Sequence, residues 1–251
     1  MSNSNTDFDF EIMNGVLTFS DDYTIILEKQ FKGNTTIRKI IIGKNIKSIG
    51  AEAFSCCPNV SEIEVLDNNK YYCPFNSNTI IERDTGLLVF GCYKSIIGKE
   101  VKAIGSFAFC GQTKLTDISI PGNCKIIGAY AFDGCENLIS ISMADGVSEI
   151  HEFAFKKCDR LESVSFPNTL TSVADSAFGK TICLDEDCYG MLLDEGCVKV
   201  NHITFSGEKK DFYRVTNFQK IFVLDSNLSY SDMIIKRTDG EIVFSNKTID
   251  W

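Results

Sequence analysis

The segment IGAYAFDGCENLISI, residues 127–141, contains a pattern that recurs along the chain. Ala-Phe pairs end at Phe54, Phe109, Phe132, Phe155 and Phe178, and the last four of these phenylalanines are spaced 23 residues apart. The first gap is 55 residues, so one repeat there carries an insertion of 32 residues. Repetition at a fixed period of this size predicts a stack of similar structural units.

Aliphatic and cysteine positions keep the same spacing from each phenylalanine. Several columns that agree in one register are a stronger signal than any single motif in the sequence. The columns are Ile49, Ile104, Ile127, Ile150 and Val173 five residues before; Cys57, Gln112, Cys135 and Cys158 three after; Val60, Leu115, Leu138 and Leu161 six after; Ile63, Ile118, Ile141 and Val164 nine after; and Val65, Ile120, Met143 and Phe166 eleven after.

Each unit combines a strand pattern with a turn pattern. Residues 116–120 and 162–166 alternate polar and apolar side chains, which predicts a short strand with one buried face. The Ile-Gly-x-x-Ala-Phe segment is expected to form one turn of helix whose Phe fills the interior. A single unit cannot bury its apolar side, so neighbours should stack about 4.8 Å apart and pair their strands in a parallel sheet.

The repeated pattern resembles the BspA-type leucine-rich repeat family, and residues 127–141 are close to its consensus. The resemblance implies an α/β repeat solenoid with a parallel β-sheet on the concave face, short helical turns on the other side and capping units at both ends. It covers roughly residues 10 to 245. Residues 76–92 resemble a hairpin insertion of this family, with its turn near residues 84–86.

The two ends of the chain depart from the repeat and resemble closing units of the family. Residues 10–19 resemble its N-terminal hairpin, and residues 203–212 and 234–242 resemble its C-terminal unit. After Phe178 the register fails, because Asp187 stands where a buried Ile is due, and the strands should resume at residues 202–205. The predicted organisation is a cap at 1–36, repeats at 37–206 with insertions at 66–92 and 179–199, and a cap at 207–251.

The composition narrows the possible partners and locations. The net charge is −9 and Lys and Arg form no run, which argues against nucleic acid or an anionic membrane surface as the partner. No apolar run approaches the roughly 20 residues that span a bilayer, so no membrane insertion is expected. The polar, acidic start of the chain does not read as a signal peptide. The chain is therefore either cytoplasmic, or secreted or at the cell surface with its signal removed.

The 11 cysteines do not suggest a disulfide framework or a zinc site. Their number is odd, and they form no paired Cys-x2-Cys units. We expect free, mostly buried thiols, with the Cys57, Cys135 and Cys158 column inside the repeat turns.

The sequence offers few candidates for catalysis. His151-Glu152 begins like a zinc-protease motif, but Phe155 stands where the second His is required. Glu62 and Glu64, on one strand face, could on paper act as a carboxylate pair, yet such charges are usually just solvated. No phosphate-binding glycine loop is present. The prediction is a protein that is not an enzyme and has no cofactor and no metal.

The outward-facing strand residues make the best candidate binding site. Their rows should line the sheet face, with small polar side chains in the middle and charged flanks beside a pair of exposed isoleucines, Ile41 and Ile96. Aromatic side chains in the insertions, Tyr71, Tyr72, Phe75 and Tyr189, are further candidate anchors. The candidate contact residues are Glu62, Glu64, Lys94, Asp117, Ser119, Ser140, Ser142, Ser163, Ser165 and His202, with Lys39 and Thr204 in the same rows.

The predicted function is recognition of a macromolecule, most simply a protein. The family resemblance implies surface attachment or contact with a host or matrix. An intracellular scaffold or regulatory module is the alternative. Carbohydrate binding is a third class, disfavoured because the predicted face carries no Trp or Tyr. The sequence does not indicate an oligomeric state.

Overall fold

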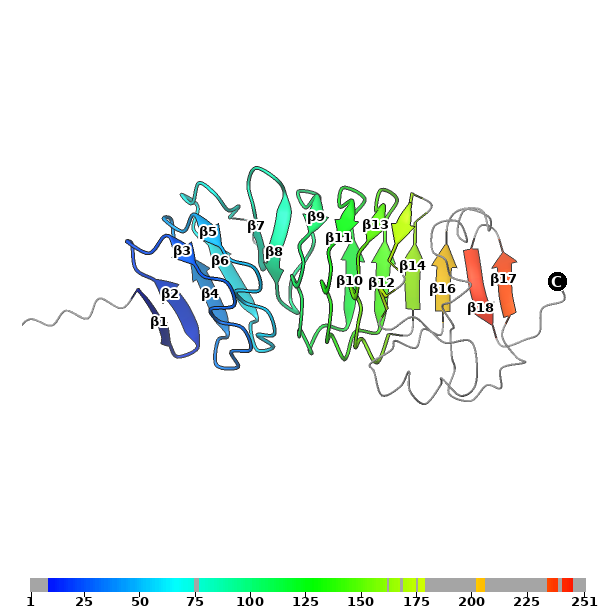
Figure 1. Cartoon of the computed structure of the whole chain (residues 1–251), viewed down its shortest axis with the longest axis horizontal. Coiled ribbons are helices and arrows are strands. Elements are labelled where there is room, and N and C mark those ends of the chain that lie inside the picture. The colour runs from blue at the N-terminus through cyan, green and yellow to red at the C-terminus, as the bar shows by residue number, and fades with distance from the viewer. Residues whose placement is uncertain are drawn as a thin grey trace, which may run out of the picture.

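The chain folds as a stack of repeats built from short β-strands. The computed structural model describes residues 9–74, 77–161, 163–167, 169–174, 176–178, 202–205, 234–238 and 241–245. Every regular element in these residues is a strand, and the strands follow one another along the long axis of the molecule (Figure 1). The predicted repeat solenoid is therefore confirmed.

The four-residue strands lie on one side of the solenoid. They form two separate sheets, in which repeat strands pair in parallel and only β1 and β2 form an antiparallel hairpin. The first sheet contains β1 (Phe10–Met13), β2 (Val16–Phe19), β4 (Lys39–Ile42) and β6 (Glu62–Val65), and the second contains β10 (Asp117–Ile120), β12 (Ser140–Met143), β14 (Ser163–Phe166) and β16 (His202–Phe205).

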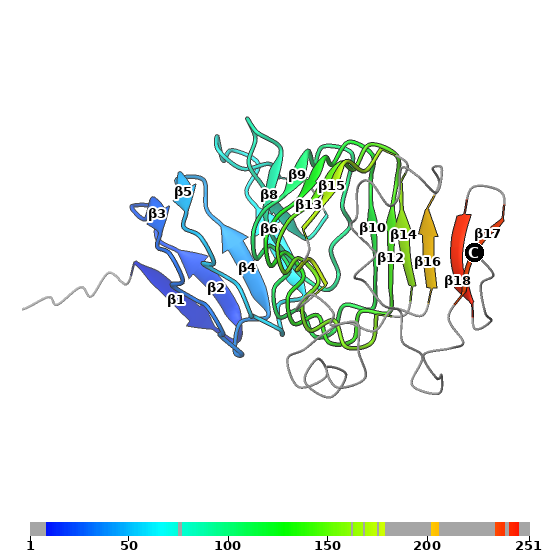
Figure 2. The same cartoon turned by 45° about the vertical axis from the view of Figure 1, so that its right-hand side comes forward.

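Shorter strands form the opposite side, which Figure 2 separates from the first. β3 (Ile25–Ile26) pairs with β5 (Ser48–Ile49). The larger sheet has the order β15 (Ser172–Val173), β13 (Glu149–Ile150), β11 (Ile126–Ile127), β9 (Ala103–Ile104), β8 (Leu87–Gly91) and β7 (Thr79–Ile81).

Hairpins occupy both ends of the described chain. Residues Asn14 and Gly15 both have positive φ, which suits the tight turn between β1 and β2. At the other end β17 (Ile234–Thr238) pairs antiparallel with β18 (Glu241–Ser245), and β18 lies beside β16. The strand predicted to resume at 202–205 is confirmed, because β16 pairs in register with β14. A capping role for either hairpin, and the domain limits, stay predictions.

The phenylalanine column forms the centre of the core. Ring centroids of Phe109 and Phe132 lie 5.0 Å apart, those of Phe132 and Phe155 5.3 Å, and those of Phe155 and Phe178 5.1 Å. All four rings are buried, as the sequence predicts. Offset stacking of this kind adds to the stabilisation from burial of the rings, so each repeat is held by its neighbours.

The predicted helical turns are wrong for the described residues. In the Ala-Phe segments Phe107, Tyr130 and Phe153 have φ of 57–61°, the left-handed region. Alternate N–H groups therefore turn toward the next repeat: Phe109 donates to the Ala131 carbonyl and Phe132 to the Ala154 carbonyl, both at 2.7 Å. A helix would need those groups to bond within their own segment, so the bonds between repeats replace the helix.

The cysteine column has a structural role inside these turns. The Sγ–H groups of Cys57, Cys135 and Cys158 each donate to the carbonyl of a phenylalanine in the preceding repeat, at 3.1–3.2 Å. Burial raises the pKa of Cys57 to about 11, so this thiol stays protonated. The expected buried, free thiols are present in the described part, with Cys56 the one that is only partly buried.

The turn of the solenoid that contains Phe31 was not predicted from the sequence, because residues 1–36 were assigned to the N-terminal cap. Phe31 stacks on Phe54 with ring centroids 5.6 Å apart, and its N–H donates to the Ala53 carbonyl as in the other repeats. Phe31 is 23 residues before Phe54, and Ile26 is 23 before Ile49. The spacing could have revealed this turn, but Gln30 replaces the usual alanine.

The insertion forms the predicted hairpin and interrupts the stack. β7 and β8 pair antiparallel, with a turn that ends at Gly86. Gly91 donates its N–H to the Ala108 carbonyl, the acceptor that the preceding repeat would otherwise use. The buried core divides into two clusters here, residues 17–92 and residues 73–178, which overlap in sequence within the hairpin. We call this boundary the joint.

Few polar contacts cross the joint between the Phe54 and Phe109 repeats. The Cys56 N–H donates to the Cys110 carbonyl at 2.8 Å. Gln112 Nε2 donates to the Cys57 carbonyl at 3.1 Å, and Lys114 Nζ donates to Asn59 Oδ1 at 2.9 Å. Gln112 stands in the cysteine column, and its amide donates to a backbone carbonyl of the preceding repeat as the column cysteines do.

Replacing Phe132 with alanine should destabilise the protein by about 3–5 kcal/mol, because it removes a buried ring and leaves a cavity between two others. Chemical denaturation monitored by circular dichroism measures this change. Glu136→Ala, an exposed substitution in the same repeat, is the control. Equal midpoints for the two variants would contradict the stacked core.

Replacing Gly91 with alanine should destabilise the protein by about 1–3 kcal/mol through overpacking. An added Cβ would lie 2.3 Å from Cε1 and 2.4 Å from Cζ of the Phe109 ring, so the ring would have to move. Gly43→Ala is the matched control, because no atom lies within 4 Å of its added Cβ. A Gly91→Ala variant as stable as the Gly43→Ala variant would contradict tight packing of the joint at Gly91.

Candidate binding surface

The exposed side chains of the four-residue strands define a surface that we call the long-strand face. Parallel register aligns them into rows: Lys39 lies beside Glu62 in one sheet, and Asp117 lies beside Ser140 in the other. Ser163 and His202 continue the second row by backbone register. The structure thus places most predicted contact residues on one side of the molecule, but in two separate sheets.

Charged side chains dominate the N-terminal part of this face. Lys39 Nζ lies 2.9 Å from a Glu64 carboxylate oxygen and 3.7 Å from a Glu62 oxygen. These ion pairs raise the pKa of Lys39, with the Glu64 hydrogen bond the largest cause. Both carboxylates are exposed, so the pairs contribute little to stability. Glu62 and Glu64 are thus neutralised only in part by one lysine.

In β10 and β12 the exposed residues of the face are small and polar, with Asp117 as the charged one. Ser140 Oγ donates to Asp117 Oδ1 at 2.5 Å, and the hydroxyls of Ser119 and Ser142 lie 2.8 Å apart. Ser165 continues the row of Ser119 and Ser142 and is half-buried. These contacts run between repeats, so the side chains already satisfy part of one another's hydrogen-bonding capacity.

Lys94 and Ile96 do not belong to a strand of this face, which corrects the sequence prediction. They lie in a turn after β8, closed by a 2.7 Å hydrogen bond from the Cys92 N–H to Ser95 Oγ. The alternation at 94–97 suggests a strand, but this segment bonds to the start of the hairpin instead: the Ile96 N–H donates to the Ser77 carbonyl at 2.9 Å, and Asn78 Nδ2 donates to the Lys94 carbonyl at 3.4 Å. Both side chains remain exposed, Ile96 at 72%.

A polar hollow lies beside β6, where the first sheet ends. Its volume is about 480 Å³, and its charged lining consists of Lys39, Glu62, Glu64 and Asp67. Asn78 closes part of the strand edge, because its Oδ1 accepts the Ile63 N–H at 3.1 Å. Three carboxylates against one ammonium group make the hollow acidic.

The predicted aromatic anchors are only partly available. Tyr71 is 44% exposed, whereas Tyr72 is buried and therefore cannot contact a partner. Burial raises the pKa of Tyr72 to about 12. Phe75, Tyr189 and the insertion at 179–199 lie outside the described residues.

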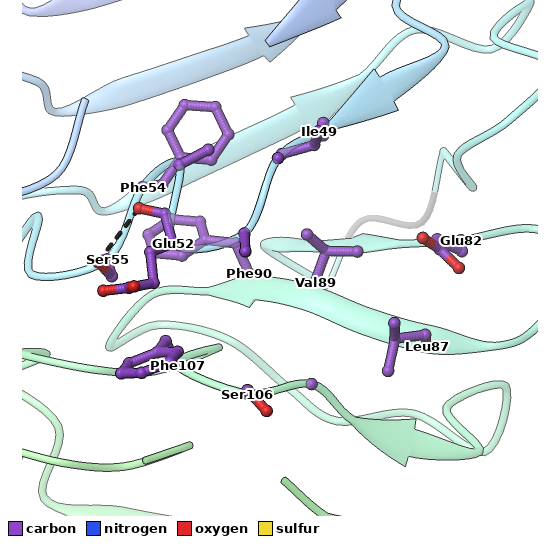
Figure 3. Close-up of a pocket in the computed structure, with 14 residues that line it drawn as sticks. Ile49, Glu52, Phe54, Ser55, Glu82, Leu87, Val89, Phe90, Ser106 and Phe107 are labelled. Atoms are coloured by element: carbon purple, nitrogen blue, oxygen red, sulfur yellow. Dashed lines mark hydrogen bonds between the residues drawn. The ribbon is translucent and has the colours of Figure 1, made fainter. Parts of the chain in front are cut away.

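A second, smaller cleft of about 200 Å³ lies at the joint. Figure 3 shows the residues that line it, which come from the turn at 49–55, from β8 and from the turn at 105–107. Glu52 and Glu82 are its charged groups. Burial opposes the ionisation of Glu52, but hydrogen bonds from Lys32 and Lys29 outweigh burial and lower the pKa of this carboxyl. The group is therefore held as a carboxylate.

The protease-like motif at His151-Glu152 is not part of a group of metal ligands in the described residues. His151 lies on an outer turn, with Nε2 3.3 Å from a Glu149 oxygen, and Phe155 of the protease-like motif is buried. The described residues contain no group of three or more His, Cys, Asp or Glu side chains arranged to hold a metal ion.

Comparison with known proteins agrees with this architecture. Six copies of the BspA type leucine rich repeat region match residues 10–81 and 92–188. No protein with a curated description matches the chain.

Two solved structures share the fold. A leucine rich cell surface protein from Faecalibacterium prausnitzii is 23% identical with a TM-score of 0.52, over 79% of this chain and 55% of its own. The pneumococcal vaccine antigen PcpA is 19% identical with a TM-score of 0.54, over 62% of this chain and 44% of its own. The chain thus spans about half the length of these two proteins. On the strength of the six matched repeats, the chain belongs to the BspA-type leucine-rich repeat family.

Proposed function

We propose that this repeat module is not an enzyme and binds a protein partner through its long-strand face. The observation that carries the proposal is the register of that face, which aligns exposed polar side chains of successive strands into rows. A rigid array of this kind offers an extended surface rather than a closed pocket, which suits a macromolecular partner.

The charges of the face support a partner with basic side chains. Glu62, Glu64 and Asp67 surround the acidic hollow, and the chain as a whole has a net charge of −9. Complementary charge would speed the encounter and fix the orientation of a partner. The neutral serine rows beyond the joint would then contribute shape and hydrogen bonds.

We also propose that the protein acts at the cell surface, in contact with a host or matrix. The support comes from the two structural neighbours, one described as a cell surface protein and the other as a vaccine antigen. No helix in the described part of the chain has the length and apolar character needed to cross a membrane.

Arginine substitutions test the long-strand face. Ser119→Arg with Ser165→Arg places two bulky charges on non-adjacent strands of the face, β10 and β14. The double variant should capture the partner at least roughly tenfold less than the unchanged chain, a loss of about 1.4 kcal/mol. Quantitative pull-down from the source organism, with binding measured on the purified partner, gives this ratio.

The control variant carries the same charges on the opposite side. Ser48→Arg with Ser172→Arg alters the exposed residues of β5 and β15 and should leave capture unchanged. Thermal midpoints of both variants check that they fold. Capture unaffected by the face variant, or lost equally in both variants, would refute the proposed contact surface.

The proposed location predicts that the chain is accessible on intact cells. An antibody against the folded chain should label unpermeabilised cells, and protease added outside should remove the signal. A cytoplasmic protein of the same organism serves as the control for cell integrity. Labelling that appears only after permeabilisation would favour the intracellular scaffold.

A further inference from the structure

The joint brings together two cysteines from different repeats. Cys56 and Cys110 have their Sγ atoms 3.2 Å apart, although they are 54 residues apart in the sequence. The Cys56 N–H also donates to the Cys110 carbonyl at 2.8 Å. This bond corresponds to the one from Gly111 to Asp133 in the next repeat, so ordinary repeat register places the two thiols side by side.

Gly111 provides the space for this contact. A Cβ at Gly111 would lie 2.7 Å from Cys56 Cα and 3.1 Å from its Sγ, closer than atoms pack. Gly111 also has a φ of 71°, which favours glycine. A disulfide bond is about 2.05 Å long, so the two sulfur atoms need to approach by only about 1 Å.

We propose that Cys56 and Cys110 form a thiol-exchange site that reacts with a low-molecular-weight disulfide and closes into a disulfide bond across the joint. The bond would covalently join the repeats on either side of the hairpin insertion. The bond would reinforce a boundary that few polar contacts cross.

The surroundings assign different roles to the two thiols. Cys56 is half-buried, whereas Cys110 is buried. The hydrogen bond from the Cys110 Sγ–H lowers the pKa of Cys56 to about 7; burial opposes this shift and the nearby Lys32 ammonium adds to it. The same hydrogen bond, together with burial, raises the pKa of Cys110. Cys56 is therefore the attacking thiolate and Cys110 the resolving thiol.

The reaction is an ordinary thiol–disulfide exchange in two steps. The Cys56 thiolate attacks one sulfur of the small disulfide, forms a mixed disulfide and releases one small thiolate. Cys110 then attacks Cys56 Sγ, loses its proton to the released thiolate, and displaces the second small thiolate, which solvent protonates. Two protein thiols are oxidised to one disulfide, and one small disulfide is reduced to two thiols.

The test treats the full-length, folded chain with oxidised glutathione at pH 7, blocks free thiols by alkylation and maps tryptic peptides without reduction. Peptide 103–114 contains Cys110, and peptide 48–70 contains Cys56 and Cys57. The two peptides should appear linked, and dithiothreitol should release them. Because Cys183, Cys188 and Cys197 lie in other peptides, the peptide map distinguishes their disulfides from the one between Cys56 and Cys110.

Variants at adjacent cysteines assign the reaction to the pair. The linked peptides should form in Cys57→Ser and should not form in Cys56→Ser, because Cys56 is the one of these two cysteines whose Sγ contacts Cys110. Cys110→Ser, whose hydroxyl can still donate to Cys56, should stop at a glutathione adduct on Cys56. In untreated protein, iodoacetamide should modify Cys56 roughly tenfold faster or more than Cys57, since the thiolate reacts and the thiol does not.

Absence of linked peptides from the treated wild-type chain would overturn the proposal, as would linked peptides in Cys56→Ser or an unmodified Cys56 in Cys110→Ser. The wild-type result does not depend on the folding of any variant. The mapping needs no binding partner, so it is independent of the outcome for the long-strand face.

Discussion

Each phenylalanine of the repeat column is covered by the equivalent ring of a neighbouring repeat. Centroid separations of 5.0–5.3 Å show that Phe109, Phe132, Phe155 and Phe178 cover one another directly. A single repeat has no second layer that could bury its ring, so the chain must stack to form a core. Stacking at this distance also fixes the strands in parallel register. The arrangement of the outer surface is therefore a consequence of the packing inside.

The same register explains why the long-strand face consists of paired side chains. Residues that are equivalent in neighbouring repeats become neighbours in space, so Ser119 lies beside Ser142 and Ser140 beside Asp117. Small hydroxyl groups bond to each other and to the Asp117 carboxylate across neighbouring strands. Such a face can recognise a complementary surface over several repeats.

The period of the sequence predicted the buried phenylalanines and the repeat strands, and the family resemblance predicted the hairpin within residues 76–92. Prediction from the sequence failed where a bond between repeats overrides a local preference. Segments containing Tyr130 or Phe153 look able to form a turn of helix, yet bonds to the next repeat hold both residues in the left-handed region. At Lys94 the alternation suits a strand, but Ser77 and Asn78 bond to this segment in place of a neighbouring strand. Phe31 keeps the 23-residue spacing and was hidden because Gln30 stands in place of alanine.

The insertion has chemical consequences because a solenoid interrupted at one point leaves groups there without their usual neighbours. At the joint, the Gly91 N–H donates to the Ala108 carbonyl, which a phenylalanine N–H would use in a regular repeat. A cleft lies between two turns, and Gln112 stands where other repeats have a buried cysteine. The one half-buried cysteine of the described residues lies there as well. Repeats that stack regularly have similar environments and therefore similar chemistry. We therefore expect binding and chemical properties specific to this chain at the insertion and at the hollow beside β6, rather than within the uniform repeats.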